Sequence, residues 1–302
     1  MPLARFRCEV EHEPVEFGEC LSCSRATAPP RGRRCQFTYP LLRALAHNDD
    51  GREGVGLSAT GLVGCTRQTA LEMLVDYTAY PHQLYPRLRG TLMHTGIEAQ
   101  QGDDEGVIVE RRFQRSPAPG VELTGQPDEI DLHRQLIVDY KTVKAIPRSV
   151  REEHIWQLNL YRWLVADGQD LATGEPVAHD IQQLGIVYLA PSEVHKRRVR
   201  LLDLEQVGRF AAKHGAAILQ ALDGEPLPPR AWDPHTHPIC RGWCSVRQQC
   251  LDAGEDGTGE FALDGEAIQE QVGPTSADDQ QRSGSRPQAA RSAQTQPPAT
   301  SR

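Results

Sequence analysis

Two aspartates and a lysine lie on two neighbouring runs of strand-like sequence. The runs extend from Asp128 to His133 and from Gln135 to Lys141, and turn residues flank them as they flank β-strands. If the strands pair antiparallel around the short turn that joins them, Asp128 and Asp139 can converge at one edge of a sheet. Lys141 follows Asp139 by two residues, so both share one strand face. The chain is therefore expected to build a sheet that carries two carboxylates and an ammonium group at one edge.

Helical and strand patterns follow one another along the rest of the chain. Helices are predicted over Phe37 to Ala46, from Ser58 or Thr60 to about Tyr77, and over Arg87 to Gln101, Glu152 to Val165 and Leu204 to Leu222. Further strands are predicted over Gly106 to Gln114, Val121 to Gly125, Ile181 to Ala190 and Val194 to Leu202. The helix over Glu152 to Val165 is expected to be amphipathic. This order predicts a mixed α/β fold.

The composition divides the chain into four parts. Residues 1–37 are polar and cysteine-rich, 38–56 form a helix and a linker, 57–252 form the main domain, and 253–302 are expected to be disordered because large apolar residues are scarce there. The net charge is −8, but the segment beyond Leu251, with nine acidic residues against four arginines, contributes −5 of it. The remainder is close to neutral, so it can carry a local basic groove for a polyanion.

Nothing in the sequence predicts a membrane span or a secretion signal. No stretch reaches 18 consecutive apolar residues, and the first seven residues lack an apolar core. A cytoplasmic protein that does not contact membranes is expected. Cysteines in such a compartment are more often metal ligands than disulfides.

The acidic pair is suited to a hard divalent cation. Mg²⁺ and Mn²⁺ prefer carboxylate oxygens, which Asp128 and Asp139 supply. Lys141 would stand beside the cation, where it could orient or help to deprotonate a water and stabilise negative charge on a phosphate. His94 could complete the coordination sphere, and the backbone carbonyl of Tyr140 is another candidate ligand.

Three further residues are auxiliary candidates. Glu110 is a carboxylate on the first predicted strand of the group. Gln157 and Tyr161 are four residues apart, so one helical face could present an amide and a phenol to the site or to a substrate. The polar edge of a packed helix is the alternative interpretation of this pair.

These motifs occur in an order that resembles a known family. The set G-T-x-x-H at Gly90 to His94, G-x-x-D at Gly125 to Asp128, D-x-K at Asp139 to Lys141 and Q-x-x-x-Y at Gln157 to Tyr161 is similar to the RecB-like branch of the PD-(D/E)XK nuclease superfamily. The resemblance extends from Leu57 to Cys250. It implies a restriction-endonuclease-like α/β fold, a central mixed β-sheet flanked by helices. It also implies catalytic positions at His94, Asp128, Asp139 and Lys141.

One set of four cysteines brackets the main domain. Cys240, Cys244 and Cys250 lie after the acidic motifs, and Cys65 lies before them. Four thiolates suit a [4Fe-4S] cluster or a structural zinc ion, and the spacing does not decide between these. The arrangement resembles the iron-sulfur exonucleases of the RecB-like branch, including the CRISPR-associated ones, and this favours iron-sulfur. The gap between Cys240 and Cys244 departs from the usual pattern of those enzymes by one residue.

The other set lies in the first 37 residues. Cys20 and Cys23 form a zinc-knuckle-like pair between Cys8 and Cys35, and His12 competes for the fourth ligand position. So short a segment needs more than apolar burial to fold, and Zn²⁺ would provide it.

The combined features predict a divalent-metal-dependent deoxyribonuclease, with exonuclease action more expected than endonuclease action. DNA that is single-stranded or has free ends is the expected substrate, and recombination, repair or CRISPR-adaptation proteins are candidate partners. Two alternatives stay open. One is a non-catalytic nucleic-acid-binding or assembly module on the same fold, and the other is a subunit that is active only with a helicase or integrase partner.

Overall fold

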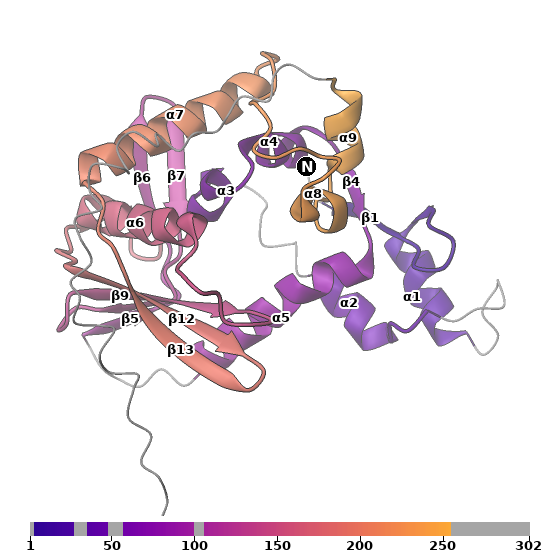
Figure 1. The fold of residues 1–302 in the computed structure, drawn as a ribbon, viewed down its shortest axis with the longest axis horizontal. Coiled ribbons are helices and arrows are strands. Elements are labelled where there is room, and N and C mark those ends of the chain that lie inside the picture. The colour runs from indigo at the N-terminus through magenta and orange to yellow at the C-terminus, as the bar shows by residue number, and fades with distance from the viewer. Residues whose placement is uncertain (1–2, 27–34, 48–56, 100–105, 255–302) are drawn as a thin grey trace, which may run out of the picture. The chain divides into compact units, whose positions relative to one another are not determined.

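A five-stranded mixed sheet carries the predicted acidic pair. Its strand order is β13-β12-β9-β8-β5 in a computed structural model that describes residues 3–26, 35–47, 57–99 and 106–254. The strands are β5 (Val107–Val109), β8 (Glu129–Asp131), β9 (Leu136–Thr142), β12 (Gln183–Ala190) and β13 (Glu193–Val199). β8 pairs antiparallel with β9, and β9 pairs in parallel with β12 (Figure 1). The predicted antiparallel pair that places Asp128 near Asp139 is therefore present.

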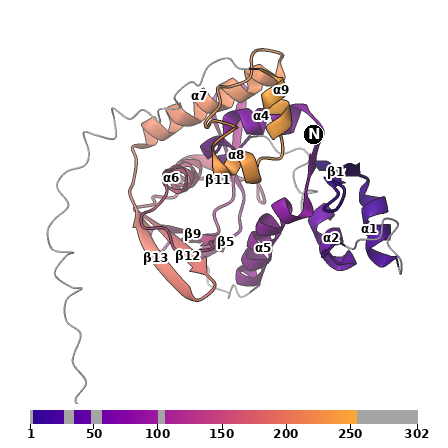
Figure 2. The same ribbon diagram turned by 45° about the vertical axis from the view of Figure 1, so that its right-hand side comes forward.

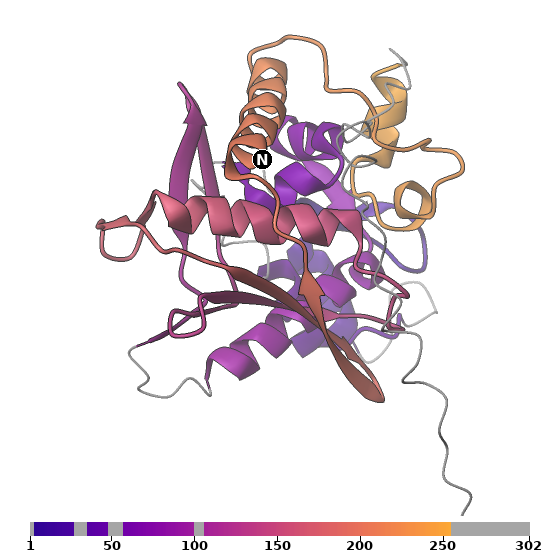
Figure 3. The same ribbon diagram turned by 60° about the vertical axis from the view of Figure 1, so that its left-hand side comes forward.

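A second five-stranded sheet lies on the other side of α6 (Glu152–Ala166). Its order is β11-β10-β6-β7-β3. The strands are β3 (Leu57–Ser58), β6 (Phe113–Ala118), β7 (Val121–Gly125), β10 (Gly168–Asp170) and β11 (Pro176–Val177). Helix α6 contacts β9 and β12 of the first sheet, β6, β7 and β10 of the second, and the long helix α7 (Leu204–Leu222). Figure 3 shows α6 running above the sheet that contains the β12–β13 hairpin. The fold is α/β, with mixed sheets flanked by helices, as predicted.

The central position of α6 corrects the expectation of an amphipathic helix. Ten of its residues, from Ile155 to Val165, are buried, including the polar Gln157 and Asn159. Asn159 donates to the carbonyl oxygens of Ile155 and Arg200 and accepts from the N–H of Leu202. A helix covered on several sides buries its polar positions too, and each must then find a partner inside the protein.

The helix predicted from Ser58 to about Tyr77 is two helices, α3 (Ala59–Val63) and α4 (Thr66–Leu74). The Ser58 hydroxyl caps α3 by accepting from the N–H of Gly61. The first helix ends at Val63, and Cys65 directly precedes α4. This break brings Cys65 to the surface of a pocket described below, and Tyr77 falls in strand β4 (Tyr77–Ala79).

The N-terminal residues are part of the same packed unit, Met1–Glu260, as the sheets. Their elements are β1 (Leu3–Arg7), β2 (Pro14–Val15), α1 (Phe17–Arg25) and α2 (Tyr39–His47). β1 lies between β2 and β4, and Leu3 and Phe6 are buried with Leu71 and Val246 in one apolar core. The remaining helices are α5 (Pro81–Glu98), α8 (Pro238–Gly242) and α9 (Arg247–Asp252).

Two predictions fall outside the described residues. These are most of the linker before residue 57 and nearly all of the tail predicted to be disordered beyond residue 253. Among the described helices, none has the length and apolar character that crossing a bilayer requires.

Candidate active site

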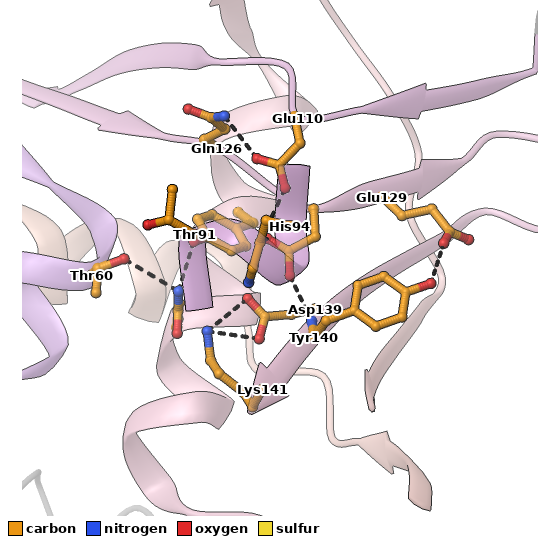
Figure 4. Close-up of polar contacts among 12 residues, drawn as sticks. Thr60, Thr91, His94, Glu110, Gln126, Glu129, Asp139, Tyr140 and Lys141 are labelled. Carbon is orange, nitrogen blue, oxygen red and sulfur yellow. Dashed lines mark hydrogen bonds and ion pairs between the residues drawn. The ribbon is translucent and has the colours of Figure 1, made fainter. Parts of the chain in front are cut away.

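His94, Glu110 and Asp128 form the tightest group of metal-binding side chains in the described part of the chain. Nδ1 of His94 lies 3.0 Å from Oε1 of Glu110 and 3.1 Å from Oδ1 of Asp128. One ligand atom from each residue lies within 4.8 Å of the other two. His94 comes from α5, Glu110 from the connection between β5 and β6, and Asp128 from the residue directly before β8. Figure 4 shows His94 and Glu110 pointing toward each other. A nitrogen and two carboxylates at this spacing fit a divalent cation.

Glu110 lies in a gap between two strands. The sequence predicts one strand over Gly106 to Gln114, but β5 ends at Val109 and β6 begins at Phe113. Glu110 has φ of 49°, a conformation that is uncommon outside glycine. Its second oxygen accepts from Nε2 of Gln126 at 2.8 Å, which fixes the carboxylate toward His94. Glu110, predicted to be auxiliary, thus belongs to the group of three side chains that could hold a metal ion.

Asp128 is held by the neighbouring strand. Its Oδ2 atom accepts from the backbone N–H of Tyr140 at 2.5 Å. The Tyr140 side chain points elsewhere, because its hydroxyl donates to Glu129 at 2.7 Å. The phenol of Tyr140 therefore takes no part in this group. The role of the Tyr140 backbone carbonyl as a metal ligand stays a prediction.

Asp139 and Lys141 lie on one face of β9, as predicted, and form a buried ion pair. Nζ of Lys141 lies 3.0 Å from Oδ1 and 2.8 Å from Oδ2 of an aspartate that is 1% exposed. Burial and the charge of Asp128 raise the pKa of Asp139, against the lowering effect of Lys141. Burial alone would lower the pKa of Lys141, but the charge of Asp139 more than offsets it and the pKa is raised. Lys141 is therefore a persistent cation and is suited to stabilising negative charge.

The carboxylates of Asp128 and Glu110 also change the pKa of the His94 imidazole. Hydrogen bonds to Asp128 and Glu110 raise its pKa to about 10, although burial opposes them. The two carboxylates thus favour a positive charge between them, which either a proton or a metal ion can supply.

Gln157 and Tyr161 lie together beside this group. Nε2 of Gln157 donates to the Tyr161 hydroxyl at 2.6 Å and to Oγ1 of Thr60 at 3.2 Å. Burial, followed by the charge of Asp139, raises the pKa of Tyr161, so the phenol stays protonated. From the sequence, Thr60 was expected only as a possible first residue of a helix. Its contact with Gln157 joins residues 97 positions apart, which no local pattern reveals.

The four cysteines that bracket the main domain line one pocket. Cys65, Cys240, Cys244 and Cys250 line it together with Trp232 and Val246. Burial raises the pKa of Cys240, and the nearby charges of Cys65 and Cys250 raise it further. Burial also raises the pKa of Cys244 to about 12. The predicted association of Cys65 with three thiols some 175 residues later is therefore present in the fold.

The N-terminal cysteines also approach one another. Burial, then the charges of Cys35, Cys8 and Cys23, raises the pKa of Cys20 to about 12. All eight cysteines are free of disulfide bonds. His12, the competing ligand, has its Nδ1 atom 3.3 Å from the hydroxyl of Tyr80.

The basic side chains divide into two groups. Arg111 pairs with Asp170 at 2.7 Å, and Arg115 pairs with Asp167 at 3.0 Å and stacks on Trp163, so both support the fold. Lys144 and Lys196, among others, are exposed on the loop after β9 and on β13. The exposed group remains the candidate contact for a polyanion.

Comparisons with known proteins extend these findings. The family profile described as "PD-(D/E)XK nuclease superfamily" matches residues 52–251. No curated protein matches the chain. Among solved structures, the one titled "Crystal structure of SSO0001" is 18% identical, covers 71% of this chain and 96% of its own, and superposes with a TM-score of 0.48.

Proposed function

The chain belongs to the PD-(D/E)XK nuclease superfamily, whose members are metal-dependent nucleases, and from this premise we propose that it hydrolyses DNA as a member of the RecB-like branch. The observation that carries the proposal is the meeting of His94, Glu110 and Asp128 beside the buried Asp139–Lys141 pair. Four acidic or imidazole groups and one fixed ammonium group are what cleavage of a charged ester requires.

The metal ligands would be His94 and Asp128 with Glu110, and Asp139 lies next to them. A Mg²⁺ or Mn²⁺ ion held there would neutralise the scissile phosphate and lower the pKa of the attacking water. The chain's own residues then orient the reacting groups. The backbone N–H of Tyr140 holds Asp128, and Gln126 holds Glu110, so neither carboxylate has to reorganise.

Lys141 would stabilise the transition state. Hydrolysis places additional negative charge on the phosphate oxygens as the bond to water forms and the bond to the leaving oxygen breaks. Asp139 keeps the ammonium group charged and directs it, because both carboxylate oxygens lie within 3.0 Å of Nζ. The raised pKa of Lys141 supports a role in charge stabilisation over one as a general base.

The proposed substrate is DNA that is single-stranded or has free ends, with exonuclease action. The support is the ordered motif set, including the Gln157–Tyr161 pair, which here forms a buried polar contact beside Lys141. Linear and circular single-stranded DNA of equal length test this directly. Degradation of the linear form alone supports exonuclease action, and nicking of circles contradicts it.

The pocket lined by Cys65, Cys240, Cys244 and Cys250 is proposed to hold a [4Fe-4S] cluster. It would tie α4 to α8 and α9, which lie far apart in sequence. Anaerobic purification followed by visible absorption and metal analysis tests the assignment. About four irons per chain and a brown colour support it, whereas zinc at these cysteines replaces it with a structural zinc site.

The function itself is tested with purified protein and linear DNA. Cleavage should require Mg²⁺ or Mn²⁺, stop on chelation, and be abolished in Asp139→Ala and Lys141→Ala. Glu193→Ala, at an exposed carboxylate on β13, is the matched control and should cut normally. Binding of DNA without metal-dependent cleavage by the wild type would favour a non-catalytic module.

A further inference from the structure

The four N-terminal cysteines lie outside the segment that the family profile matches, and the nuclease site makes no use of them. Cys8 follows β1, Cys20 and Cys23 lie one turn apart on α1, and Cys35 lies before α2. We propose that these four thiols bind one Zn²⁺ ion, and that this site fixes the start of α5, the helix that carries His94.

The local fold places the four cysteines on or beside neighbouring elements. A tight turn follows β1, in which the N–H of Cys8 donates to the carbonyl of Glu13 and the N–H of His12 donates to the carbonyl of Cys8. Strands β1 and β2 return the chain directly to α1, where Phe17 packs edge-on against Phe6 at 4.6 Å. Cys20 is thereby placed at the margin of the apolar core.

Cys35 reaches the same region through the contact between α1 and α2. The guanidinium of Arg25, at the end of α1, stacks on the ring of Tyr39 at 3.6 Å. Cys35 lies four residues before Tyr39, and its thiol faces the carbonyl of Phe37 at 3.8 Å. Helix α1 contacts both β1 and α2, so the elements that carry or flank the four cysteines are neighbours.

Four cysteines on neighbouring elements are a ligand set that suits a metal ion. Zn²⁺ binds such thiols by displacing their protons, so the ligands are thiolates only when the metal is bound. In the described part of the chain no three sulfur atoms lie within 4.8 Å of one another. Tetrahedral zinc with Zn–S bonds of about 2.3 Å holds its sulfurs ~3.8 Å apart, so binding would draw the thiols inward.

The segment also lacks a core of its own. Helix α1 has nine residues and no buried residue, and isolated helices of this length are unstable in water. Phe17, Cys20 and Leu21 pack against the neighbouring apolar core, but each is only partly buried. A metal ion at Cys20 and Cys23 would fix the helix, as in other small metal-stabilised segments.

The link to the active site runs through Glu9, the residue after Cys8. Oε1 of Glu9 accepts from the backbone N–H of His82 at 2.8 Å, and its carboxylate also meets Nδ1 of His82 at 2.9 Å. His82 is in the first turn of α5, where N–H groups lack helical partners and a negative charge is favourable. The turn that presents Cys8 therefore also caps the helix of His94.

Two further contacts reinforce the link. β1 pairs in parallel with β4, the strand immediately before α5. The ring of Tyr80, the residue before the helix, contacts Nδ1 of His12 through its hydroxyl and lies beneath the guanidinium of Arg7. Figure 2 shows α1 and α2 beside β1 near the start of α5. His12 contributes its Nδ1 atom to this contact, and the proposed ligands are the four cysteines.

Metal analysis of the full-length protein tests the site independently of nuclease activity. One zinc per chain is expected, lost in Cys23→Ser and retained in Ser22→Ala. Both residues are exposed on α1, so neither change removes core packing. Cobalt substituted for zinc should give the visible and charge-transfer bands of four-sulfur tetrahedral coordination. Wild-type protein without zinc, whose four N-terminal thiols alkylate as fast as those of the unfolded chain, would overturn the site.

Hydrogen exchange tests the link to α5, whose functional meaning rests on the proposed role of His94. The first turn of α5 should exchange about tenfold faster in Cys23→Ser and in Glu9→Gln, a change of the size that loss of a helix cap produces. Helix α7 should be unchanged in both. Glu9→Gln keeps all four thiols, so it should retain zinc. Unchanged exchange of α5 in the zinc-free Cys23→Ser variant would refute the link while leaving the nuclease assignment untouched.

Discussion

Oε1 of Glu110 lies 3.0 Å from Nδ1 of His94, across a break between two strands and a separation of sixteen residues. The contact makes Glu110 a member of the proposed metal site, and its partner Gln126 sets the orientation of the carboxylate. No short motif contains both residues. The contact exists because β5 and β6 are separate strands.

Glu110→Gln should weaken metal binding. The amide keeps the shape of the side chain but removes one negative charge from the group. The Mn²⁺ concentration needed for half-maximal cleavage should rise on the order of tenfold to a hundredfold. Glu129→Gln is the control, because Glu129 accepts from the Tyr140 hydroxyl outside the group. Equal metal requirements in wild type and Glu110→Gln would exclude Glu110 from the site.

Gly125→Ala should destabilise the fold at the start of the G-x-x-D motif. An added Cβ would lie 2.5 Å from Cδ1 of Leu164 and 3.0 Å from the ring of Tyr161. Overpacking of this kind costs about 1 to 3 kcal/mol. Gly18→Ala meets no neighbouring atom within 4 Å and serves as the control. Urea midpoints measure both, and an unchanged midpoint for Gly125→Ala would show that α6 can move away freely.

Tyr161→Phe should slow cleavage without unfolding the protein. The change leaves Nε2 of Gln157 with only Thr60 as a partner. Loss of one such hydrogen bond corresponds to a rate decrease of about tenfold. Tyr140→Phe removes a hydroxyl that faces Glu129 and should cut at the wild-type rate. Full activity of Tyr161→Phe would restrict the Gln157–Tyr161 pair to packing.

The buried imidazole of His154 makes the free energy of unfolding depend on pH. Burial, followed by the charges of Lys141 and Arg151, lowers its pKa from 6.5 to about 3, and its Nδ1 atom lies 2.9 Å from the Tyr188 hydroxyl. Below about pH 6.5 the His154 imidazole is protonated in the unfolded chain, but in the folded chain it stays neutral down to about pH 3. Stability is therefore lost as pH falls through this window.

His154→Gln removes this titration and can still hydrogen-bond with Tyr188. The drop in unfolding free energy between pH 7 and pH 5 should be smaller than in the wild type by on the order of 1 kcal/mol. Urea unfolding at the two pH values gives the difference. Equal losses in the two proteins would mean that His154 is protonated in the fold.

The sequence predicted the parts of the site that depend on local periodicity. Asp139 and Lys141 share a strand face because alternate residues of a strand must do so, and the short turn before Leu136 made the β8–β9 pair the simplest arrangement. The association of Cys65 with the three later cysteines followed from their number and placement. These are relationships between residue types at fixed spacing.

The remainder depends on tertiary packing. The strand break at Glu110 and the break between α3 and α4 each occur inside a segment whose pattern fits one continuous element. Asn159 is buried because α6 contacts strands of both sheets, a relationship that the periodicity of the helix does not contain. Thr60 and Glu9 act across distances in sequence that no local signal spans.

The central claim is that one group of side chains holds the metal while Lys141 stabilises charge beside it. Mn²⁺ binding and DNA cleavage, measured on the same preparations of wild type, Asp128→Asn and Lys141→Met, separate the two roles. We predict that Asp128→Asn loses both binding and cleavage. Lys141→Met should bind Mn²⁺ at least as tightly as the wild type yet cut at least about a hundredfold more slowly. Wild-type cleavage by either variant would contradict the account.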